Sequence, residues 1–217
     1  MVDMPHIIIY MAAPESKKKE RKEVKDEISR AWREDIRRAV DVMSKGGVIL
    51  YPTDTIWGIG CDAQNEAAVR RVFEIKQRAD AKALISLVDS AERVQRYIRN
   101  VPAVAWDVMD CSVSPITIIF DGASGLAPNL LAEDGSAAIR VTKETFSREL
   151  CYRMQRAIVS TSANISGEPS PRCFDEISEE LKGLVDYVCT SRRNEKNPAA
   201  SSIIRIREGG EVQIIRK

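Results

Sequence analysis

The chain has 217 residues, 44% of them hydrophobic, and a formal net charge of +1 at pH 7. This length suits one large domain or two small ones, and the apolar content can build a substantial core. The balanced charge gives no support for strong electrostatic binding to nucleic acid or to an anionic membrane. No apolar run approaches the roughly 18 residues of a membrane helix, and the apolar residues 7–13 have no Lys or Arg before them. We therefore expect a cytoplasmic protein with no membrane association.

Residue types that are scarce also limit the chemistry. The five cysteines are scattered and form no C-x-x-C pair, which argues against a disulfide framework and against a structural metal held by the protein. The single histidine is His6, so a serine or cysteine nucleophile activated by histidine is nearly excluded. No G-x-x-x-x-G-K-[ST] motif occurs, so ATP would have to bind without a P-loop.

The predicted elements alternate between helices and strands. Residues 14–30 are rich in Lys, Glu and Arg, which is typical of a solvated helix or tail. An apolar repeat at helical spacing follows, ended by two glycines, and consists of Trp32, Ile36, Ala39, Val40 and Met43. Beyond it we expect strands at 48–51, 84–88, 116–120, 137–141, 158–160 and 185–189, helices at 65–76, 91–99, 102–109, 144–154 and 174–181, and a hairpin of 202–206 with 212–216. This order predicts one α/β domain with a mixed sheet.

A dense polar motif, STSANISGEPSP, occupies residues 160–171 directly after the apolar pair Ile158 and Val159. The order predicts a buried strand that runs into a polar loop. Hydroxyls, an amide and backbone N–H groups at such a strand end can bind phosphate or carboxylate. A Ser/Thr/Asn turn that satisfies only its own backbone is the alternative.

A second polar motif, YPTDTIWGIG, occupies residues 51–60 and also follows a predicted strand. Thr53, Asp54 and Thr55 offer polar groups, and the two glycines allow a close approach of the backbone. Ligands of open α/β sheets bind at strand ends, so the two motifs predict one shared crevice. A tight turn capped by Asp54 is the alternative.

Two cations, Lys76 and Arg78, stand at the end of the helix predicted at 65–76. Such a pair can flank a polyphosphate, with lysine as a point charge and arginine as a bidentate fork. Surface helices also end in Lys and Arg because of the helix dipole alone, and both interpretations stay open at this point.

Together these motifs resemble the YrdC-like family of threonylcarbamoyl-adenylate synthases. The match runs from about residue 33 to 216 and includes, in order, YPTDTIWGIG, IKQRADAKAL, SPITIIF, AAIRV, STSANISGEPSP and AASSIIRI. The resemblance implies a single YrdC-like α/β domain over residues 31–217, with a twisted mixed sheet and flanking helices around a concave cavity. Residues 1–30 would form a charged, partly ordered extension.

The resemblance also implies a reaction. ATP, L-threonine and bicarbonate would be condensed into threonylcarbamoyl-AMP and pyrophosphate, with Mg²⁺ carried on the ATP phosphates. A separate tRNA threonylcarbamoyl transferase complex would use the product to modify tRNA, and weak tRNA binding, as double-stranded RNA, is implied as well. The substrates supply the nucleophiles, so the protein has only to position anions and stabilise charge. This fits a chain without a histidine-activated nucleophile.

Matching motifs imply a role for each candidate site residue. Lys76 and Arg78 would contact the nucleotide phosphates and the carbamate, and Arg140 would hold the threonine carboxylate. The other nucleotide-binding residues would be Ser162, Asn164 and Ser201, and the other threonine-binding residues Thr53, Thr55, Thr117 and Ser160. Thr161 and Ser166 are weaker candidates. The chain departs from the usual family residues, without loss of a charged candidate, at Trp57, Ala79, Ala83, Ser114, Ala200 and Ser202.

Two other functions stay open on the sequence. One is a non-catalytic RNA-binding paralogue of the same fold, against which the retained K-x-R and S-x-N motifs and the balanced charge argue. The other is a carbamoyl-transfer domain of the kind found in hydrogenase maturation proteins. Those proteins normally carry acylphosphatase and zinc-finger segments, and this sequence has neither.

Overall fold

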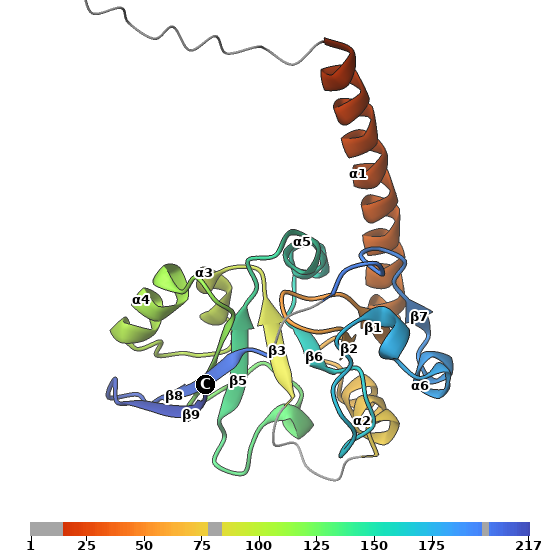
Figure 1. Cartoon of the computed structure of the whole chain (residues 1–217). Coiled ribbons are helices and arrows are strands. Elements are labelled where there is room, and N and C mark those ends of the chain that lie inside the picture. Colours follow the sequence, from red (N-terminus) through yellow and green to blue (C-terminus); the bar gives the residue numbers. More distant parts are fainter. Residues whose placement is uncertain (1–14, 78–83, 197–199) are drawn as a thin grey trace, which may run out of the picture.

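A single mixed β-sheet organises the molecule (Figure 1). The computed structural model describes residues 15–77, 84–196 and 200–217, with side chains from residue 30 onward. Within these residues, nine strands are hydrogen-bonded in the order β7-β1-β2-β6-β3-β5-β4-β8-β9. The strands are β1 (Ile49–Tyr51), β2 (Gly58–Gly60), β3 (Ile85–Val88), β4 (Ile116–Phe120), β5 (Ala137–Val141), β6 (Ile158–Ser162), β7 (Tyr187–Val188), β8 (Ser202–Ile206) and β9 (Val212–Arg216). Strand β5 runs parallel to β3 and antiparallel to β4, so the prediction of a mixed sheet is confirmed.

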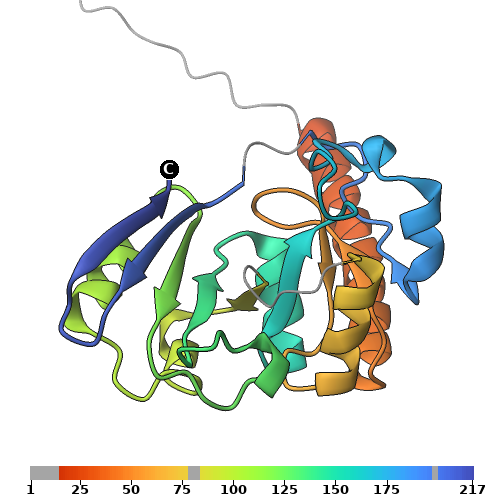
Figure 2. The same ribbon diagram turned by 90° about the horizontal axis from the view of Figure 1, so that it is seen from below.

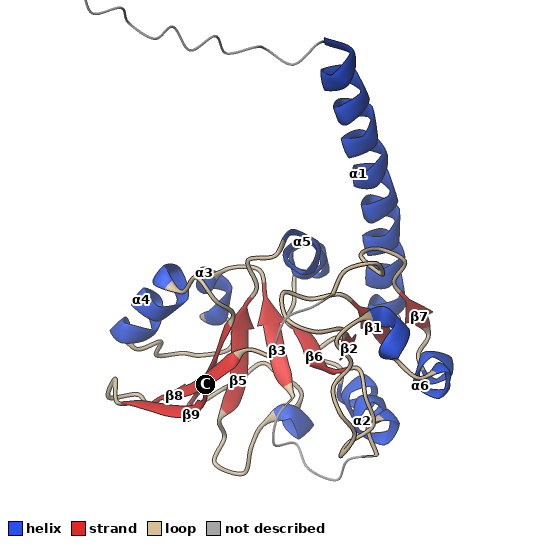
Figure 3. Cartoon of the chain, in the orientation of Figure 1, coloured by secondary structure: helices blue, strands red, loops and turns tan. Residues whose placement is uncertain are grey.

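Helices lie on both faces of this sheet. They are α1 (Glu15–Ser44), α2 (Glu66–Ile75), α3 (Ala91–Val94), α4 (Ala103–Cys111), α5 (Thr145–Met154) and α6 (Glu179–Leu184), with short 3-10 turns η1 (Pro128–Leu130) and η2 (Phe174–Glu176). Helices α3, α4 and α5 cover one face, and α2 lies on the other (Figures 1 and 3). Viewed from below, the β8–β9 hairpin and α6 stand at opposite ends of the molecule (Figure 2). None of the described helices has the length and apolar character needed to cross a membrane.

The core lies between the sheet and these helices. Its largest fully buried side chains are aromatic and include Trp57, Tyr51, Tyr97, Phe120 and Phe146. Removing such a side chain from water contributes about 1.5–3 kcal/mol each, before the entropy of ordering it is subtracted. Packing of this hydrophobic core holds in position the strands whose ends carry the polar motifs.

Helix α1 is only partly packed. Its N-terminal part extends away from the sheet, while Ile36, Ala39 and Met43 in its last turns are buried (Figure 1). Asp35, 2% exposed, accepts hydrogen bonds from the Tyr187 hydroxyl (2.7 Å) and the backbone N–H of Ser191 (2.7 Å), which anchors these turns. The helix passes through residues 30 and 31 without a break, and a domain boundary there stays a prediction.

Strand β2 was not expected from the sequence, because it consists of Gly58, Ile59 and Gly60, and glycine disfavours strands. The sheet selects glycine here for space. A Cβ on Gly60 would lie 2.5 Å from Cε1 of Tyr51 and 2.7 Å from the carbonyl oxygen of Val159. Close packing of neighbouring strands therefore overrides the low strand propensity.

The helix predicted at 174–181 is wrong in its position. A 3-10 turn at Phe174–Glu176 is followed by α6, which begins after Ser178. The Ser178 hydroxyl accepts from the N–H of Leu181 at 3.2 Å. An N-cap residue has non-helical backbone angles, so this cap interrupts the predicted helix. The other expected elements are present, although the helix predicted at 91–99 ends at Val94 and the strand predicted at 185–189 covers only Tyr187–Val188.

Candidate active site

Strand pairing brings the two polar motifs together. Strand β2 pairs antiparallel with β6, and Gly58 stands opposite Ser162. The loop of residues 52–57 therefore ends beside the start of the STSAN loop. A Cβ on Gly58 would lie 3.3 Å from the Ser160 hydroxyl, so glycine at this position permits the close approach of the two segments.

The hydroxyls of the 52–57 loop are buried and ordered by one another. Thr53 and Thr55 are 1% and 4% exposed, and their Oγ1 atoms lie 3.0 Å apart. Thr53 donates to the carbonyl oxygen of Ile56 at 2.7 Å and accepts from the N–H of Thr55 at 3.0 Å. Since a hydroxyl has one hydrogen, Thr55 must donate to Thr53 and keeps lone pairs for another partner. Thr55 lines a cavity, whereas Thr53 supports it from behind.

Lys76 ties the end of α2 to the STSAN loop. Its ammonium donates to the carbonyl oxygens of Ser162 (2.7 Å) and Asn164 (2.7 Å) and lies 3.3 Å from Ser162 Oγ and 3.1 Å from Asn164 Oδ1. The side chain is 2% exposed. The positive φ of Gln77, 49°, ends the helix directly after Lys76. The K-x-R lysine and both S-x-N residues are thus in contact. Arg78, together with Ala79 and Ala83, lies outside the described residues.

Arg140 is a second buried cation, contributed by β5. It is 3% exposed, and its Nη2 lies 3.0 Å from Oδ1 of Asp54, whose side chain is 9% exposed. The pair is close, but its geometry does not make a hydrogen bond: Arg140 Nε and Asp54 Oδ1 have no hydrogen-bond partner among the described residues. Burial raises the pKa of the Asp54 carboxyl, and the Arg140 charge opposes this shift only in part.

A hydroxyl pair closes the site on its other side. Thr117 of β4 and Ser201, the residue before β8, lie 2.8 Å apart through their side-chain oxygens and are 0% and 2% exposed. Strands β4 and β8 run in parallel with Ile116 opposite Ser202, which places these two side chains together. The sequence positions differ by 84 residues, so this contact depends on the sheet topology.

These segments enclose a cavity of about 190 Å³. Its polar lining comes from Thr55, Arg140, Ser160, Thr161, Ser162, Ser170, Ser201 and Arg216. Lys76, Asn164, Thr53 and Thr117 stand one contact behind this lining. Ser166 lies farther out and donates its backbone N–H to the Lys76 carbonyl oxygen at 3.0 Å. A lining of hydroxyls and fixed cations suits a ligand rich in anionic oxygens.

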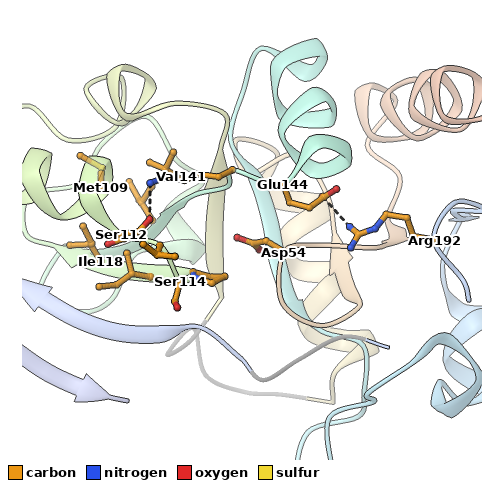
Figure 4. Close-up of a pocket in the computed structure, with 13 residues that line it drawn as sticks. Asp54, Met109, Ser112, Ser114, Ile118, Val141, Glu144 and Arg192 are labelled. Carbon is orange, nitrogen blue, oxygen red and sulfur yellow. Dashed lines mark hydrogen bonds and ion pairs between the residues drawn. The ribbon is translucent and has the colours of Figure 1, made fainter. Parts of the chain in front are cut away.

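A second cavity of about 300 Å³ has Asp54 in its lining (Figure 4), and Arg140, the ion-pair partner of Asp54, lines the first cavity. Its walls are largely apolar and come from α4, β4 and β5, with the Glu144–Arg192 ion pair (3.1 Å) beside Asp54. Arg192 also donates to the carbonyl oxygen of Thr53 at 3.2 Å and has a positive φ of 59°. A strained non-glycine backbone is maintained only where the surrounding contacts fix it. Arg192 therefore acts as a brace for the 52–57 loop.

Sequence reasoning assigned no ligand-binding role to Asp54, Ser170, Arg192 or Arg216. Asp54 and Ser170 lie inside the quoted motifs, so their position was a usable signal. Arg192 and Arg216 carry no motif, and only the folded chain brings them to the site. Among the described residues no group of three or more His, Cys, Asp or Glu side chains is arranged to hold a metal ion.

Comparison with known proteins agrees with this architecture. The Sua5/YciO/YrdC family model, described as "Telomere recombination", matches residues 41–217. The chain belongs to this family. It is 33% identical over 167 residues to a threonylcarbamoyl-AMP synthase of Shigella flexneri, covering 76% of this chain and 88% of that protein. It is 32% identical over 185 residues to a synthase of the same name from Xanthomonas euvesicatoria, covering 84% and 97%.

A solved structure of this family contains an amino acid. P. abyssi Sua5 complexed with L-threonine superposes with a TM-score of 0.69 at 26% identity, over 78% of this chain. This chain spans half the length of that protein, 50%. The predicted fold, a single α/β domain of the YrdC type with a twisted mixed sheet, is confirmed by the family match and by this superposition.

Proposed function

We propose that this chain is an L-threonylcarbamoyladenylate synthase, a nucleotidyltransferase that makes threonylcarbamoyl-AMP and pyrophosphate from L-threonine, bicarbonate and ATP. The single observation that carries the proposal is the cavity itself. It gathers Arg140, hydroxyls of three motifs and a lysine-bound S-x-N loop from segments far apart in sequence. The names of the relatives, at 32–33% identity over most of their length, support the same activity.

The residues would act by positioning the reactants. We assign binding of the threonine carboxylate to Arg140, because a guanidinium can donate two parallel hydrogen bonds to a carboxylate. Thr55 and Ser160 would line the part of the cavity that holds threonine. Thr53 holds Thr55 in place through their hydroxyl contact, and Thr117 holds Ser201 in the same way on the other side of the cavity. The threonine amine attacks the carbon of bicarbonate, an N–C bond forms and water leaves. The resulting carbamate attacks the α-phosphorus of ATP and displaces pyrophosphate. No covalent intermediate on the protein is required.

The nucleotide end would be formed by the S-x-N loop. Ser162 and Ser201 offer hydroxyls to the phosphates, and Asn164 fixes the loop through Lys76. Lys76 stabilises the loop and places a positive charge beside the phosphates, where negative charge develops. Arg78 is assigned to the phosphates by its motif alone. Mg²⁺ would arrive with ATP, bound by phosphate oxygens and water, and the hydroxyl and amide oxygens of this loop are ligands that Mg²⁺ accepts.

The product would be passed to a tRNA threonylcarbamoyl transferase complex for the N6-threonylcarbamoyladenosine modification of tRNA, in the cytoplasm. Threonylcarbamoyl-AMP is a mixed anhydride, and an activated acyl group of this kind needs an acceptor such as a base amine. We also propose that the protein binds tRNA weakly, as double-stranded RNA, in addition to its synthase activity. Residues 31–217 are proposed as the catalytic domain, with 1–30 as an extension.

The deciding assay measures pyrophosphate release from ATP and Mg²⁺, with L-threonine and bicarbonate omitted in turn. The synthase activity predicts release that needs both, with L-serine a poor substitute. A folded protein that releases no pyrophosphate under any combination would instead be a non-catalytic binding module. Release without threonine, in the presence of carbamoyl phosphate, would indicate a carbamoyl-transfer domain.

A further inference from the structure

Asp54 is in an unusual state for a buried carboxylate. It stands 3.0 Å from Arg140, yet its Oδ1 accepts no hydrogen bond from any described residue, and Arg140 Nε donates none. Buried polar groups are normally satisfied, and an incomplete buried ion pair is a poor source of stability. An unused acceptor on Asp54, which lines the second cavity, and an unused donor on Arg140, which lines the first, therefore belong to one ion pair.

The neighbouring acid, Glu144, differs from Asp54 because both of its carboxylate oxygens accept hydrogen bonds. Glu144 accepts hydrogen bonds from the N–H of Phe146 (2.7 Å) and from the N–H and hydroxyl of Ser147 (2.9 and 2.8 Å), and it forms an ion pair with Arg192 (3.1 Å). In Figure 4 Glu144 points toward Arg192, whereas the Asp54 carboxylate points the other way, toward Ser112 and Ser114. Of the acidic side chains lining the two cavities, only Asp54 has an oxygen without a hydrogen-bond partner among the described residues.

The ligand that complements this pair carries an acceptor and a donor next to each other. An α-amino acid has both, since its carboxylate and its ammonium are bonded to the same carbon. We propose that Asp54 and Arg140 form a receptor for the amino acid zwitterion: the substrate carboxylate replaces Asp54 on Arg140, and Asp54 accepts a hydrogen bond and then a proton from the substrate ammonium. This proposal rests on the proposed function and adds a residue to which that function gives no role. Two buried charges then meet two substrate charges, so the exchange leaves no charge unpaired.

The proton transfer makes the amine reactive. An ammonium has no lone pair, so its N–H bond must break before nitrogen can form a bond to carbon. Asp54 takes that proton and becomes the neutral acid, and the free amine keeps the electron pair. The amine and bicarbonate then give the carbamate anion and one water molecule, which balances without an oxidant or reductant. Asp54 later returns its proton to solvent.

The surroundings of Asp54 bear on its titration. It is faced by Arg140 of β5, by Glu144 at the start of α5 and by Arg192, with Lys143 on the cavity wall. The buried Tyr51 hydroxyl and Cys151 thiol also interact electrostatically with Asp54. Burial is the main cause that raises the pKa of Asp54, and cations oppose it. A substrate carboxylate on Arg140 would cancel one of these cations and so raise the pKa further, which favours proton transfer from the ammonium.

The test compares two ligands by calorimetric titration without ATP: L-threonine and 3-hydroxybutyrate, which has the same carbon skeleton but no ammonium. The wild-type protein is expected to prefer L-threonine by at least about tenfold, as the loss of one charged contact gives. In Asp54→Asn this preference should disappear, and in Asp54→Glu it should partly return. Equal binding of the two ligands by the wild-type protein would overturn the proposal, and so would an unchanged preference in Asp54→Asn.

A second readout separates proton transfer from binding. In the wild-type enzyme kcat should fall on the acid side as Asp54 becomes protonated, and Asp54→Asn should have a low kcat without this acid limb. Asp62→Asn is the matched control, because Asp62 is also buried, at 3% exposed, and pairs with Arg156 (2.6 Å) near the opposite end of β6. This variant should keep both the preference for L-threonine and the fall of kcat at acid pH. If Asp54→Asn does not fold, the Asp54→Glu profile and the wild-type ligand preference decide. If the protein prefers threonine but releases no pyrophosphate, the proposed synthase activity is wrong and the proposed Asp54–Arg140 receptor stands. If it releases pyrophosphate but shows no preference between the two ligands, the synthase activity stands and the receptor is wrong.

Discussion

Replacing Lys76 by methionine tests whether its ammonium organises the site. Lys76 is 2% exposed and gives two short hydrogen bonds, both 2.7 Å, to the carbonyl oxygens of Ser162 and Asn164. Each hydrogen bond from a charged group contributes about 1.5–3 kcal/mol, and carbonyl groups that lose their donor while buried are costly. Methionine fills similar space and removes the cost of burying a charge, so we expect a net loss of about 2–4 kcal/mol.

This loss should be visible as a shift in thermal unfolding. For a chain of this size each kcal/mol lowers Tm by about 2–4 °C, so the Lys76→Met protein should melt roughly 4–16 °C below the wild type by circular dichroism. Pyrophosphate release at a temperature where both proteins are folded should fall by more than ~100-fold, the scale of a lost contact of about 3 kcal/mol with developing charge.

The control for Lys76 is Lys45, whose ammonium pairs with Asp41 at 2.8 Å on the surface with 73% of its side chain exposed. Exposed pairs contribute about 0–1 kcal/mol, so Lys45→Met should leave Tm and activity nearly unchanged. Lys76→Met with a wild-type melting curve would refute the claim that this ammonium holds the loop. If Lys45→Met lowers Tm and activity as much as Lys76→Met does, the effect would not be specific to Lys76.

Three further predictions follow from the described contacts. Arg140→Ala should reduce synthesis more than ~100-fold in the pyrophosphate assay and weaken L-threonine binding, and near-full activity would remove Arg140 from the site. Gly60→Ala should lower the unfolding free energy by several kcal/mol in urea titration, because its Cβ would meet Tyr51 at 2.5 Å; a change under ~0.5 kcal/mol would contradict the packing argument. Asp186 has a lowered pKa: burial raises it, but a backbone N–H and Arg71 more than compensate. The contribution of ionised Asp186 to folding stability is therefore present above the usual aspartate pKa and is lost as pH falls through the pKa of the folded state. The Tm of Asp186→Asn should approach that of the wild type in acid. A Tm difference between the two proteins that does not change with pH would contradict this prediction.

The sheet and most of its helices could be predicted because apolar periodicity reflects burial directly. The strand at 116–120 and the helix at 144–154 are examples in which pattern and position agree with the structure. Strand β2 could not be predicted, since its glycines are chosen by contacts with Tyr51 and Val159, and those contacts do not exist in a local window of sequence. Similarly, the break before α6 depends on one serine cap within a sequence that otherwise has helical spacing.

The site was predictable where one motif contains both the group and its support. Thr53 and Thr55 order each other within three residues, so the motif itself carries the geometry. Arg192 is different, because it reaches the Thr53 carbonyl oxygen across 139 positions, and nothing in its neighbourhood signals that role. Sequence reasoning therefore finds the groups that face the ligand more readily than the groups that brace them.

The burial of Arg140 and Lys76 separates two ways of handling a buried cation. Lys76 is surrounded by carbonyl and hydroxyl oxygens, which satisfy the charge within the protein. Arg140 instead faces one carboxylate at 3.0 Å without a hydrogen bond and retains an unused Nε donor. A cation that is fully satisfied stabilises a loop, whereas a cation that is incompletely satisfied is available to a ligand. On this argument Lys76→Met should cost mainly stability and charge at the phosphate end, while Arg140→Ala should cost mainly affinity for L-threonine. A measured KM for threonine that rises more in Lys76→Met than in Arg140→Ala would reverse the two assignments.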